Sequence, residues 1–424
     1  MNFYIETFGC TFNQADSQIM AGLLNENEGK LVDNPQEADV IIINTCYVKH
    51  PTEQKVVNRI QRLQEKFPDK KLLIAGCMVE IDPDKLQKTA PNAGWISPHQ
   101  ITSTSHVVKS ILKGDNVKLT GSDNSIKVGL PKIRSNPLIH IIQICEGCNG
   151  ACSYCCTRFA RGKLQSYPGD LIYFEADKSI NDGCVEIQLT AQDTAAYGKE
   201  TGKSLSNLIN QVTAVNGDFR VRIGMMHPKN MMNDLDNIIH SFQNEKVYKF
   251  IHIPIQSGND NVLADMNREH SVDDFKDIIT QFQRSITDIS IATDVIVGYP
   301  SEDNNAFNDT LKLIGELKPD FLHISKYHHR PGTPASNLNE IDHHIMKERS
   351  KKLNNLKSEI ALQNNKRMIN TIQKVLITSK GSKGGYIGRS NNYKTVIVDE
   401  ASLGCFVEVE IIEAKSTYLK GEII

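Results

Sequence analysis

Six short apolar segments between residues 137 and 330 alternate with helical patterns, and this alternation limits the fold more than any other feature of the chain. The segments are LIHIIQI, VEIQLT, RVRIGMM, KFIHIPI, ISIATDVIVG and FLHISKY. Parallel strands need a crossover connection, and a helix between successive strands supplies it. The pattern therefore predicts a partial (β/α)₆ barrel, three-quarters of the usual eightfold barrel, with a side opening wide enough for a macromolecular substrate.

A similar alternation fills the first hundred residues. Its apolar segments NFYIETFG, DVIIINT and KLLIAG each run into a cysteine, namely Cys10, Cys46 and Cys77. The carboxyl ends of parallel strands meet at one edge of a sheet, where open α/β sheets bind their ligands. We therefore expect a parallel-sheet α/β domain in which three distant thiols meet. Ordinary core cysteines are the alternative, because no local spacing marks this set.

The remaining segments set the expected domain boundaries. Residues 113–136 are polar and rich in Gly, Ser and Asn, which is typical of a linker. After a basic helix expected over 341–370, short apolar runs between Gly-rich turns predict a small antiparallel β-barrel suited to nucleic acid. The expected fold class is α/β, with an N-terminal domain (1–112), a linker (113–136), a barrel core (137–365) and a C-terminal RNA-binding β-barrel (366–424).

Composition excludes several classes of protein. The chain has 424 residues, of which 39% are hydrophobic and 23% charged, and this favours a globular, multidomain protein. No apolar run approaches the ~20 residues that cross a bilayer, so we expect a cytoplasmic protein without a membrane partner. The formal net charge of −2 hides a basic region, because twelve Lys and Arg face two Glu between His344 and Lys394. This region is either a solvated helix face or a surface for nucleic acid.

The most specific chemical signal is the C-x₃-C-x₂-C spacing of Cys148, Cys152 and Cys155 after the first barrel strand. Three thiolates hold three irons of a 4Fe–4S cubane and leave the fourth iron open. An open iron suits S-adenosylmethionine (SAM), whose amino and carboxylate groups chelate it. Ten cysteines in a chain with no export signal also favour metal chemistry over disulfides.

A zinc site is the alternative for this loop, because Cys145 extends it to two C-x₂-C pairs. Zinc ribbons and fingers separate such pairs by about 12–20 residues, whereas three residues separate them here. Cys145 and Cys156 flank the motif and are expected to pack rather than bind metal, since Cys145 ends an apolar strand. Core packing is also expected for Cys184 and Cys405.

Longer motifs surround both cysteine sets. They are TFGCTFNQADS, INTC and AGCMVE in the N-terminal domain, EGCNGACSYCCTRFARG in the cysteine loop, and EIQLTAQDTAAYG, IHIPIQSGND, VLADMNR, TDVIVGYPSE and SKYHHRPGTPA along the barrel. Together they resemble the radical-SAM methylthiotransferases over essentially the whole chain, and the tail is similar to the small RNA-binding β-barrel of that family. The resemblance implies that Cys10, Cys46 and Cys77 bind an auxiliary 4Fe–4S cluster.

The resemblance also implies a reaction, which replaces an unactivated C–H bond by C–S–CH₃. One SAM is cleaved reductively at the cluster on Cys148, Cys152 and Cys155, and the resulting 5′-deoxyadenosyl radical abstracts the substrate hydrogen. A second SAM methylates a sulfur on the auxiliary cluster. The implied cofactors are two [4Fe–4S] clusters and SAM. The implied partners are the anticodon stem-loop of tRNA, an external electron donor and a sulfur source, without DNA.

The segments RIGMMHP, ISKYHHRPGTPA and KERSKKL resemble the archaeal and eukaryotic branch of the family, which modifies carbon 2 of threonylcarbamoyladenosine. His227 is a departure, since Asn is common there. Another modified tRNA adenosine or a ribosomal-protein aspartate remains as an alternative substrate. A non-catalytic iron–sulfur protein that binds RNA or senses redox state is the alternative of another class.

Polar residues near strand ends are candidates for cofactor binding. Tyr154, inside the cysteine loop, is expected to pack against the SAM adenine. Gln192, Asp193, Gln256 and Ser257 are expected to form hydrogen bonds with SAM or substrate at the barrel mouth, with turn capping as the alternative.

Other residues have more than one interpretation. Gly298 allows close backbone approach to a cofactor, or serves the architecture alone. Arg158 and Arg161 suit the SAM carboxylate or RNA phosphate. His328 and His329 do not form a metal pair, because adjacent residues of an extended segment point in opposite directions.

Basic residues of the C-terminal barrel are expected to contact RNA phosphates: Lys374, Lys380, Lys383, Arg389 and Lys394. Tyr386 and Tyr393 are the expected stacking partners for RNA bases.

Overall fold

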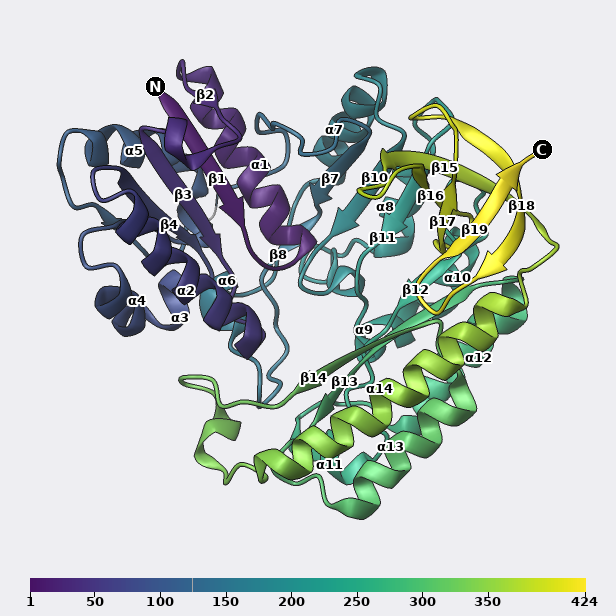
Figure 1. The fold of residues 1–424 in the computed structure, drawn as a ribbon. Coiled ribbons are helices and arrows are strands. Elements are labelled where there is room, and N and C mark those ends of the chain that lie inside the picture. Colours follow the sequence, from purple (N-terminus) through teal and green to yellow (C-terminus); the bar gives the residue numbers. More distant parts are fainter. Residues whose placement is uncertain (124) are drawn as a thin grey trace.

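The computed structural model describes residues 1–123 and 125–424, and it begins with a parallel sheet between two layers of helices (Figure 1). The strand order is β2-β1-β3-β4-β5-β6. The elements are β1 (Asn2–Thr7), α1 (Thr11–Glu26), β2 (Lys30–Leu31), β3 (Val40–Thr45), α2 (His50–Lys66), β4 (Lys71–Gly76), α3 (Met78–Ile81), α4 (Pro83–Thr89), β5 (Gly94–Ile96), α5 (Thr104–Leu112) and β6 (Lys118–Leu119). Every residue of β3 is buried, as expected for a central parallel strand covered on both faces, and the predicted α/β domain is confirmed.

The central region contains the predicted parallel strands, arranged as two linked sheets, β11-β10-β7 and β12-β13-β14. The strands are β7 (Ile139–Gln143), β10 (Glu186–Thr190), β11 (Arg220–Ile223), β12 (Phe250–His252), β13 (Ser290–Val297) and β14 (Phe321–Lys326). The covering helices are α7 (Gly169–Asn181), α8 (Leu205–Thr213), α10 (Leu235–Phe242), α12 (Val272–Ser285) and α13 (Asn304–Leu317). A parallel bridge between Val221 and Val247 links the two sheets, so the partial barrel is confirmed.

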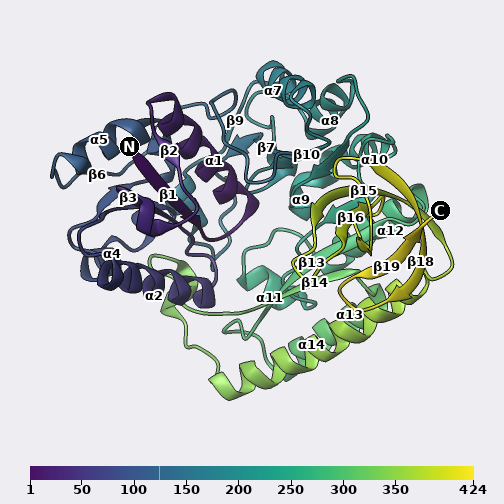
Figure 2. The ribbon, with the colours of Figure 1, turned by 45° about the horizontal axis from the view of Figure 1, so that its top comes forward.

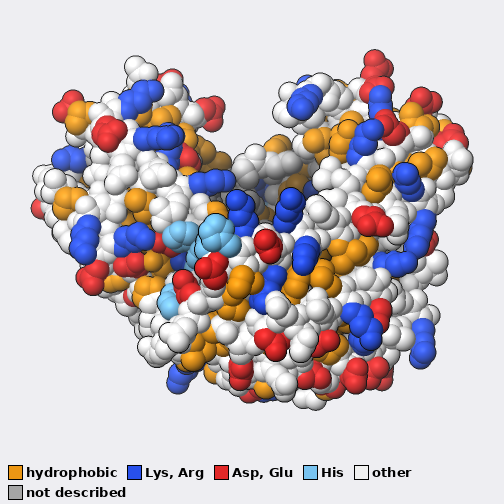
Figure 3. Space-filling view, turned by 60° about the horizontal axis from the view of Figure 1, so that its bottom comes forward, with side chains coloured by type: hydrophobic (Ala, Val, Ile, Leu, Met, Phe, Trp, Pro, Cys, Tyr) orange, Lys and Arg blue, Asp and Glu red, His pale blue; other side chains and the backbone are white. Residues whose placement is uncertain are grey.

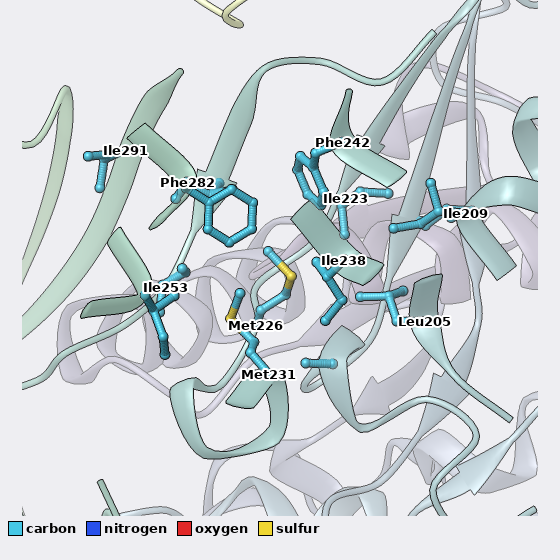
Figure 4. Close-up of a cluster of buried hydrophobic side chains, with 14 of the residues drawn as sticks. Leu205, Ile209, Ile223, Met226, Met231, Ile238, Phe242, Ile253, Phe282 and Ile291 are labelled. Carbon is cyan, nitrogen blue, oxygen red and sulfur yellow. The ribbon is translucent and has the colours of Figure 1, made fainter. Parts of the chain in front are cut away.

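The main hydrophobic core lies between the outer face of these strands and the helices (Figure 4). Ile223, Ile253 and Ile291 come from successive strands, and they lie near Phe242 of α10 and Phe282 of α12. The two Phe rings meet edge to face, with centroids 5.5 Å apart. Since side chains alternate along a strand, the residues between these apolar ones face the barrel interior.

The C-terminal region is a long helix followed by a closed barrel. The helix is α14 (His343–Lys366), and the strands are β15 (Ile372–Lys380), β16 (Tyr386–Ser390), β17 (Thr395–Val398), β18 (Phe406–Ala414) and β19 (Leu419–Ile423). They close in the order β15-β16-β17-β19-β18, and β17 pairs with β19 in parallel while the other pairs are antiparallel. The predicted β-barrel is confirmed. None of the helices in residues 1–123 and 125–424 combines the length and apolar character needed to span a membrane.

The segment expected to be a linker is attached to the N-terminal domain at several of its described residues, 113–123 and 125–136. Its residues 118–119 form β6 of the N-terminal sheet. The Ile133 N–H donates to the Gln18 carbonyl at 3.0 Å, and the Lys127 side chain is 1% exposed. The described part of the segment is thus mostly exposed or half-buried, as a linker would be, but Lys127 anchors it through buried charged partners.

One hairpin of the C-terminal barrel closes the end of the partial barrel where the strands begin (Figures 1 and 2). The Tyr393 ring packs on Tyr248 and Phe250, with centroids 4.8 and 5.0 Å away. The Lys394 ammonium pairs with Asp320 at 2.5 Å. Both residues were expected to contact RNA, and both expectations are wrong, because Lys394 is 4% exposed and the two side chains hold the domains together.

Gly298, at the end of β13, was expected to approach a cofactor, but the structure fills the space beside it with α14. Its φ is +80°, and a Cβ added there would lie 2.2 Å from Met346 Cγ. Met346 is buried, so the glycine allows α14 to pack against the sheet.

We predict that Gly298→Ala lowers the melting temperature of the cofactor-free protein, because it adds both backbone strain and overpacking. The expected cost is roughly 1–3 kcal/mol. Gly315→Ala is the matched control, since Gly315 lies in α13 with open space around it, and helix propensity favours Ala there by about 1 kcal/mol. Thermal unfolding followed by circular dichroism checks both. Equal melting temperatures for wild type and Gly298→Ala would contradict this packing role.

Candidate active site

Cys10, Cys46 and Cys77 lie together at the carboxyl edge of the N-terminal sheet. Cys10 caps α1, Cys46 follows β3, and Cys77 begins α3 after β4. Burial, followed by the charges of Cys77 and Cys10, raises the pKa of the Cys46 thiol to about 12. Gly9 permits this approach at φ +111°, because a Cβ there would lie 2.6 Å from Cys46 Cβ. The three thiols, distant in sequence, are thus near enough to interact electrostatically, and a shared metal site remains a prediction.

Cys148, Cys152 and Cys155 lie in the loop between β8 (Cys145–Glu146) and α6 (Thr157–Arg161). Burial raises the pKa of the Cys148 thiol to about 11, and the charges of Asp193, Cys155 and Cys152 add to the rise. Burial and the charge of Cys152 also raise the pKa of Cys155. The Gly150 N–H donates a hydrogen bond to Cys148 Sγ at 3.2 Å.

Arg161 joins the two thiol sets from a fully buried position. Its Nη1 donates to Asp16 at 2.7 Å and to Glu146 at 2.8 Å, and its Nη2 donates to Asn13 at 2.7 Å. Asp16 and Asn13 belong to α1, which begins beside Cys10, whereas Arg161 ends the helix that follows Cys155. The Arg161 side chain is 1% exposed, so its expected role as a ligand of SAM or RNA phosphate is wrong.

Lys127 completes a charge-balanced cluster with Arg161, Asp16 and Glu146. Its ammonium lies 3.0 Å from Asp16 and 2.9 Å from Glu146. Burial alone would raise the pKa of Asp16, but the charges of Arg161 and Lys127 outweigh it and hold that pKa below its ordinary value. Two cations and two carboxylates thus remain ionised and paired, which offsets the cost of burying them. We call these four residues the junction cluster.

Cys156 shows how close the two thiol sets lie to each other. Burial, then the charge of Cys155 and more weakly that of Cys77, raises the pKa of its thiol. Its Sγ lies 3.9 Å from the Tyr47 carbonyl oxygen, and it packs in the core of the N-terminal domain. Cys156 therefore stands between the two domains as a packed residue, as expected.

A second junction joins the domains beside α2. The Arg330 guanidinium donates to Glu53 at 2.6 Å and lies over the Tyr47 ring at 4.9 Å. Lys85 also pairs with Glu53. His328 packs on His50, with ring centroids 4.6 Å apart, and not with its neighbour His329. The RPGTPA segment therefore fixes the position of the N-terminal domain over the barrel.

Each thiol set has the donor chemistry of an iron–sulfur cluster site. Thiolates are the protein ligands of such clusters, so metal binding releases the thiol protons and neutralises the mutual repulsion of neighbouring thiolates. Arg268 Nη1 lies 3.6 Å from Cys152 Sγ, and N–H groups of this kind tune cluster potentials. Cys145, which zinc would need, is fully buried with its Sγ near the Asp193 carbonyl oxygen at 3.8 Å.

Gln192 and Asp193 position the loops of the site. The side-chain Oε1 of Gln192 accepts from the Gly147 N–H at 2.7 Å, directly before Cys148. The Asp193 carboxylate accepts from Ala195, His227 and Asn230, and it is 3% exposed. These contacts of Asp193 correspond to the turn-capping alternative, and its expected hydrogen bonds with SAM remain a prediction.

Gln256 and Ser257 follow β12 at the barrel mouth. Gln256 has φ +75°, and its backbone bonds Asp294 and Ile296 of β13 at 2.8 and 2.9 Å. Ser257 is fully buried, and its Oγ accepts from the Asn259 N–H at 3.3 Å. Ser257 therefore caps a turn, which corrects its expected role, while the half-buried Gln256 side chain remains a candidate.

Tyr154 lies beside Cys152 and packs against Tyr299, with ring centroids 6.5 Å apart. Three residues were missed from the sequence, namely Arg268 and His270 near this loop and Asn13 beside Cys77 and Arg161. The Arg268 guanidinium lies between Cys152 Sγ and the Pro254 carbonyl oxygen, to which it donates at 2.8 Å. The Arg268 carbonyl oxygen lies 2.7 Å from His270 Nδ1. In the sequence, the one signal that pointed to Arg268 was its place at the end of the VLADMNR motif.

His227, the departure from the expected family pattern, also lies at the barrel mouth. Its ring meets His270 edge to face at 5.3 Å, and its Nδ1 accepts from the Lys229 N–H at 3.2 Å. Burial, assisted by the charge of Arg268, lowers the pKa of His227 to about 2. The imidazole is therefore neutral and caps α9 (Pro228–Met231).

The predicted RNA-contacting residues divide into exposed and packed groups. Lys380 and Lys383 are exposed at the β15–β16 turn, and Lys374 is exposed but pairs with Asp218 at 3.7 Å. Arg389 lies over the Tyr393 ring at 4.7 Å, at the interface with the central region. Figure 3 shows a hollow between the N-terminal domain and the C-terminal barrel, with Lys and Arg side chains along its rim.

The other cysteines and Arg158 are placed as follows. Cys145 and Cys184 are buried, as expected, whereas Cys405 is exposed and its expected core packing is wrong. Arg158 is exposed on α6, so it remains available to an anionic ligand.

Models of known families match three parts of the chain. They are described as Uncharacterized protein family UPF0004 (residues 2–97), Radical SAM superfamily (142–314) and TRAM domain (366–424). Among solved structures, the radical S-adenosylmethionine methyltransferase TsrM from Kitasatospora setae is similar in fold, with a TM-score of 0.56 and 11% identity over 79% of this chain and 75% of that one.

Two relatives that match 99% of this chain are both described as threonylcarbamoyladenosine tRNA methylthiotransferases, one of them as probable. A probable threonylcarbamoyladenosine tRNA methylthiotransferase of Methanothermobacter thermautotrophicus is 54% identical over 99% of both chains. The threonylcarbamoyladenosine tRNA methylthiotransferase of Mus musculus is 37% identical over 99% of this chain and 73% of its own length. The chain belongs to the radical-SAM family of threonylcarbamoyladenosine tRNA methylthiotransferases.

Proposed function

We propose that this protein converts threonylcarbamoyladenosine in the anticodon stem-loop of tRNA to its 2-methylthio derivative. The observation that carries the proposal is the pair of thiol sets, which come from separate domains and lie on either side of the buried Arg161. One open-iron site is enough to form a radical, and a second site beside it provides for sulfur transfer. The shared description of the relatives supports the substrate.

We assign one [4Fe–4S] cluster and SAM to Cys148, Cys152 and Cys155, and a second [4Fe–4S] cluster to Cys10, Cys46 and Cys77. The bound cofactors supply reductive cleavage of SAM on one side and a methylated sulfur on the other. The protein's own residues hold the cysteine loop through Gln192, place Arg268 against Cys152 and pack Tyr154 near that thiol. An electron donor and a sulfur source act from outside the chain.

The proposed tRNA surface combines the hollow in Figure 3 with the exposed lysines of the C-terminal barrel. The anticodon loop enters through the open side of the partial barrel, between β7 and β14. Lys380 and Lys383 at the β15–β16 turn contact phosphates of the stem, and we place the reaction in the cytoplasm.

We predict that removing one thiol set separates two steps of the reaction. The anaerobically reconstituted wild-type protein, supplied with SAM, a reductant, sulfide as the sulfur source and an anticodon stem-loop RNA containing threonylcarbamoyladenosine, yields 5′-deoxyadenosine and the methylthio nucleoside. The Cys10→Ala/Cys46→Ala/Cys77→Ala variant is expected to yield 5′-deoxyadenosine alone. The Cys148→Ala/Cys152→Ala/Cys155→Ala variant is expected to yield neither. Liquid chromatography with mass spectrometry measures both products.

Cys405→Ala is the control for loss of a thiol outside both sets, and it keeps both products because Cys405 is exposed and distant in sequence from them. The assignment of roles is wrong if the first triple variant loses SAM cleavage as well. The substrate is wrong if wild type forms 5′-deoxyadenosine but never modifies this RNA, and a ribosomal-protein aspartate is then the next target to examine.

We also predict that tRNA affinity falls steeply as salt rises. Lys380→Ala/Lys383→Ala is expected to reduce the slope of log affinity against log salt by about 2, since each phosphate contact contributes about 1. Lys312→Ala is the matched control, because this side chain is 78% exposed on α13, and its slope stays at the wild-type value. Fluorescence anisotropy from low to high salt measures the slopes, and a flat wild-type curve would rule out the surface.

A further inference from the structure

The interior of the partial barrel carries charged and aromatic side chains that the cysteine sites do not use. Val221 and Ile223 of β11 belong to the outer core, so Arg222 between them faces inward. The same alternation directs His252, Asp294 and His323 inward from β12, β13 and β14. His252 Nε2 lies 2.5 Å from Asp294, and its ring lies 5.4 Å from that of His323.

Arg222 is a partly buried cation without an ionic partner. Within residues 1–123 and 125–424, its guanidinium forms neither a hydrogen bond nor an ion pair, and its buried Nε has no acceptor. It lies over the rings of Phe250 and Tyr393, at 5.5 and 5.4 Å. These rings hold the guanidinium in place while its N–H groups stay free.

The acidic group near Arg222 is already engaged. Glu186 accepts from Gln188 at 2.6 Å and from Tyr248 at 3.0 Å, and it is 1% exposed. Arg389, which lies over the Tyr393 ring at 4.7 Å, adds a second cation near Glu186. Two guanidinium groups, those of Arg222 and Arg389, thus lie near the single carboxylate of Glu186, and the unpaired N–H groups of Arg222 can take a further anion.

The position of Arg222 relative to the cysteine loop indicates which part of a bound ligand carries the anionic group. Phe250, at the start of β12, lies beside Arg222. His252 and then Pro254 follow at two-residue steps toward the carboxyl ends of the strands. The Pro254 carbonyl binds Arg268, which reaches Cys152. A ligand that places one end at the cysteine loop thus extends past His252 toward Arg222.

We propose that Arg222 binds the carboxylate of the threonylcarbamoyl group and selects the modified adenosine over plain adenosine. The proposal rests on the proposed function. Carbon 2 of the adenine must face the cysteine loop, and the substituent on N6 then leaves the ring on the side away from the loop, toward the start of the strands. Its terminal carboxylate matches the two parallel N–H groups that arginine offers.

Binding of three stem-loop RNAs tests this assignment. They differ only at the target position, which carries threonylcarbamoyladenosine, its methyl ester or adenosine. Wild type is expected to bind the free acid about tenfold or more tightly than the ester, because a charge-assisted contact is worth about that much. Arg222→Gln is expected to bind acid and ester alike, and Arg222→Lys to give an intermediate ratio because it keeps the charge but not the fork.

Arg220→Gln is the matched control, since Arg220 lies on the same strand but stacks on Phe406 and pairs with Asp218. Its ratio of acid to ester affinity stays at the wild-type value. Equal wild-type binding of acid and ester, which needs no variant to fold, would overturn the proposal, and so would an unchanged ratio in Arg222→Gln. Methylthio product from wild type and the free acid is measured in parallel, and its absence would instead overturn the proposed function.

Discussion

The junction cluster of Asp16, Lys127, Glu146 and Arg161 is the interaction on which the rest of the site depends. It joins α1, which starts at Cys10, to the helix that follows Cys155, and it does so without exposing any of its four charges. Removing one partner of such a buried set costs about 3–5 kcal/mol, because the remaining charges lose their compensation. The two thiol sets, which come from different domains, are thereby held in one arrangement.

An ion pair between the buried Lys394 and Asp320 also attaches the C-terminal barrel to the partial barrel. The hairpin that carries Tyr393 and Lys394 closes the far end of the barrel and provides an aromatic surface for Arg222. The C-terminal barrel is thus packed onto the partial barrel and contributes a side chain to its interior layer.

Patterns that are local in sequence predicted much of this architecture. Strand–helix alternation located the sheets, and strand ends located Cys10, Cys46 and Cys77, because these features depend only on neighbouring residues. Residues whose roles arise from distant partners were missed or misplaced. The sequence suggested Lys394 as a phosphate contact, whereas the structure pairs it with Asp320. It suggested Asp193 as a ligand of SAM, whereas in the structure three N–H groups donate to its carboxylate. Arg161 and Arg222 have no periodicity or spacing that separates them from surface arginines.

The central claim is that two iron–sulfur clusters lie on either side of Arg161. Diffraction data collected at the iron absorption edge from crystals of the anaerobically reconstituted protein test it most directly. The account predicts two separate anomalous peaks, one bounded by Cys10, Cys46 and Cys77 and the other by Cys148, Cys152 and Cys155. A single iron peak at one thiol set, or a zinc signal that includes Cys145, would contradict it.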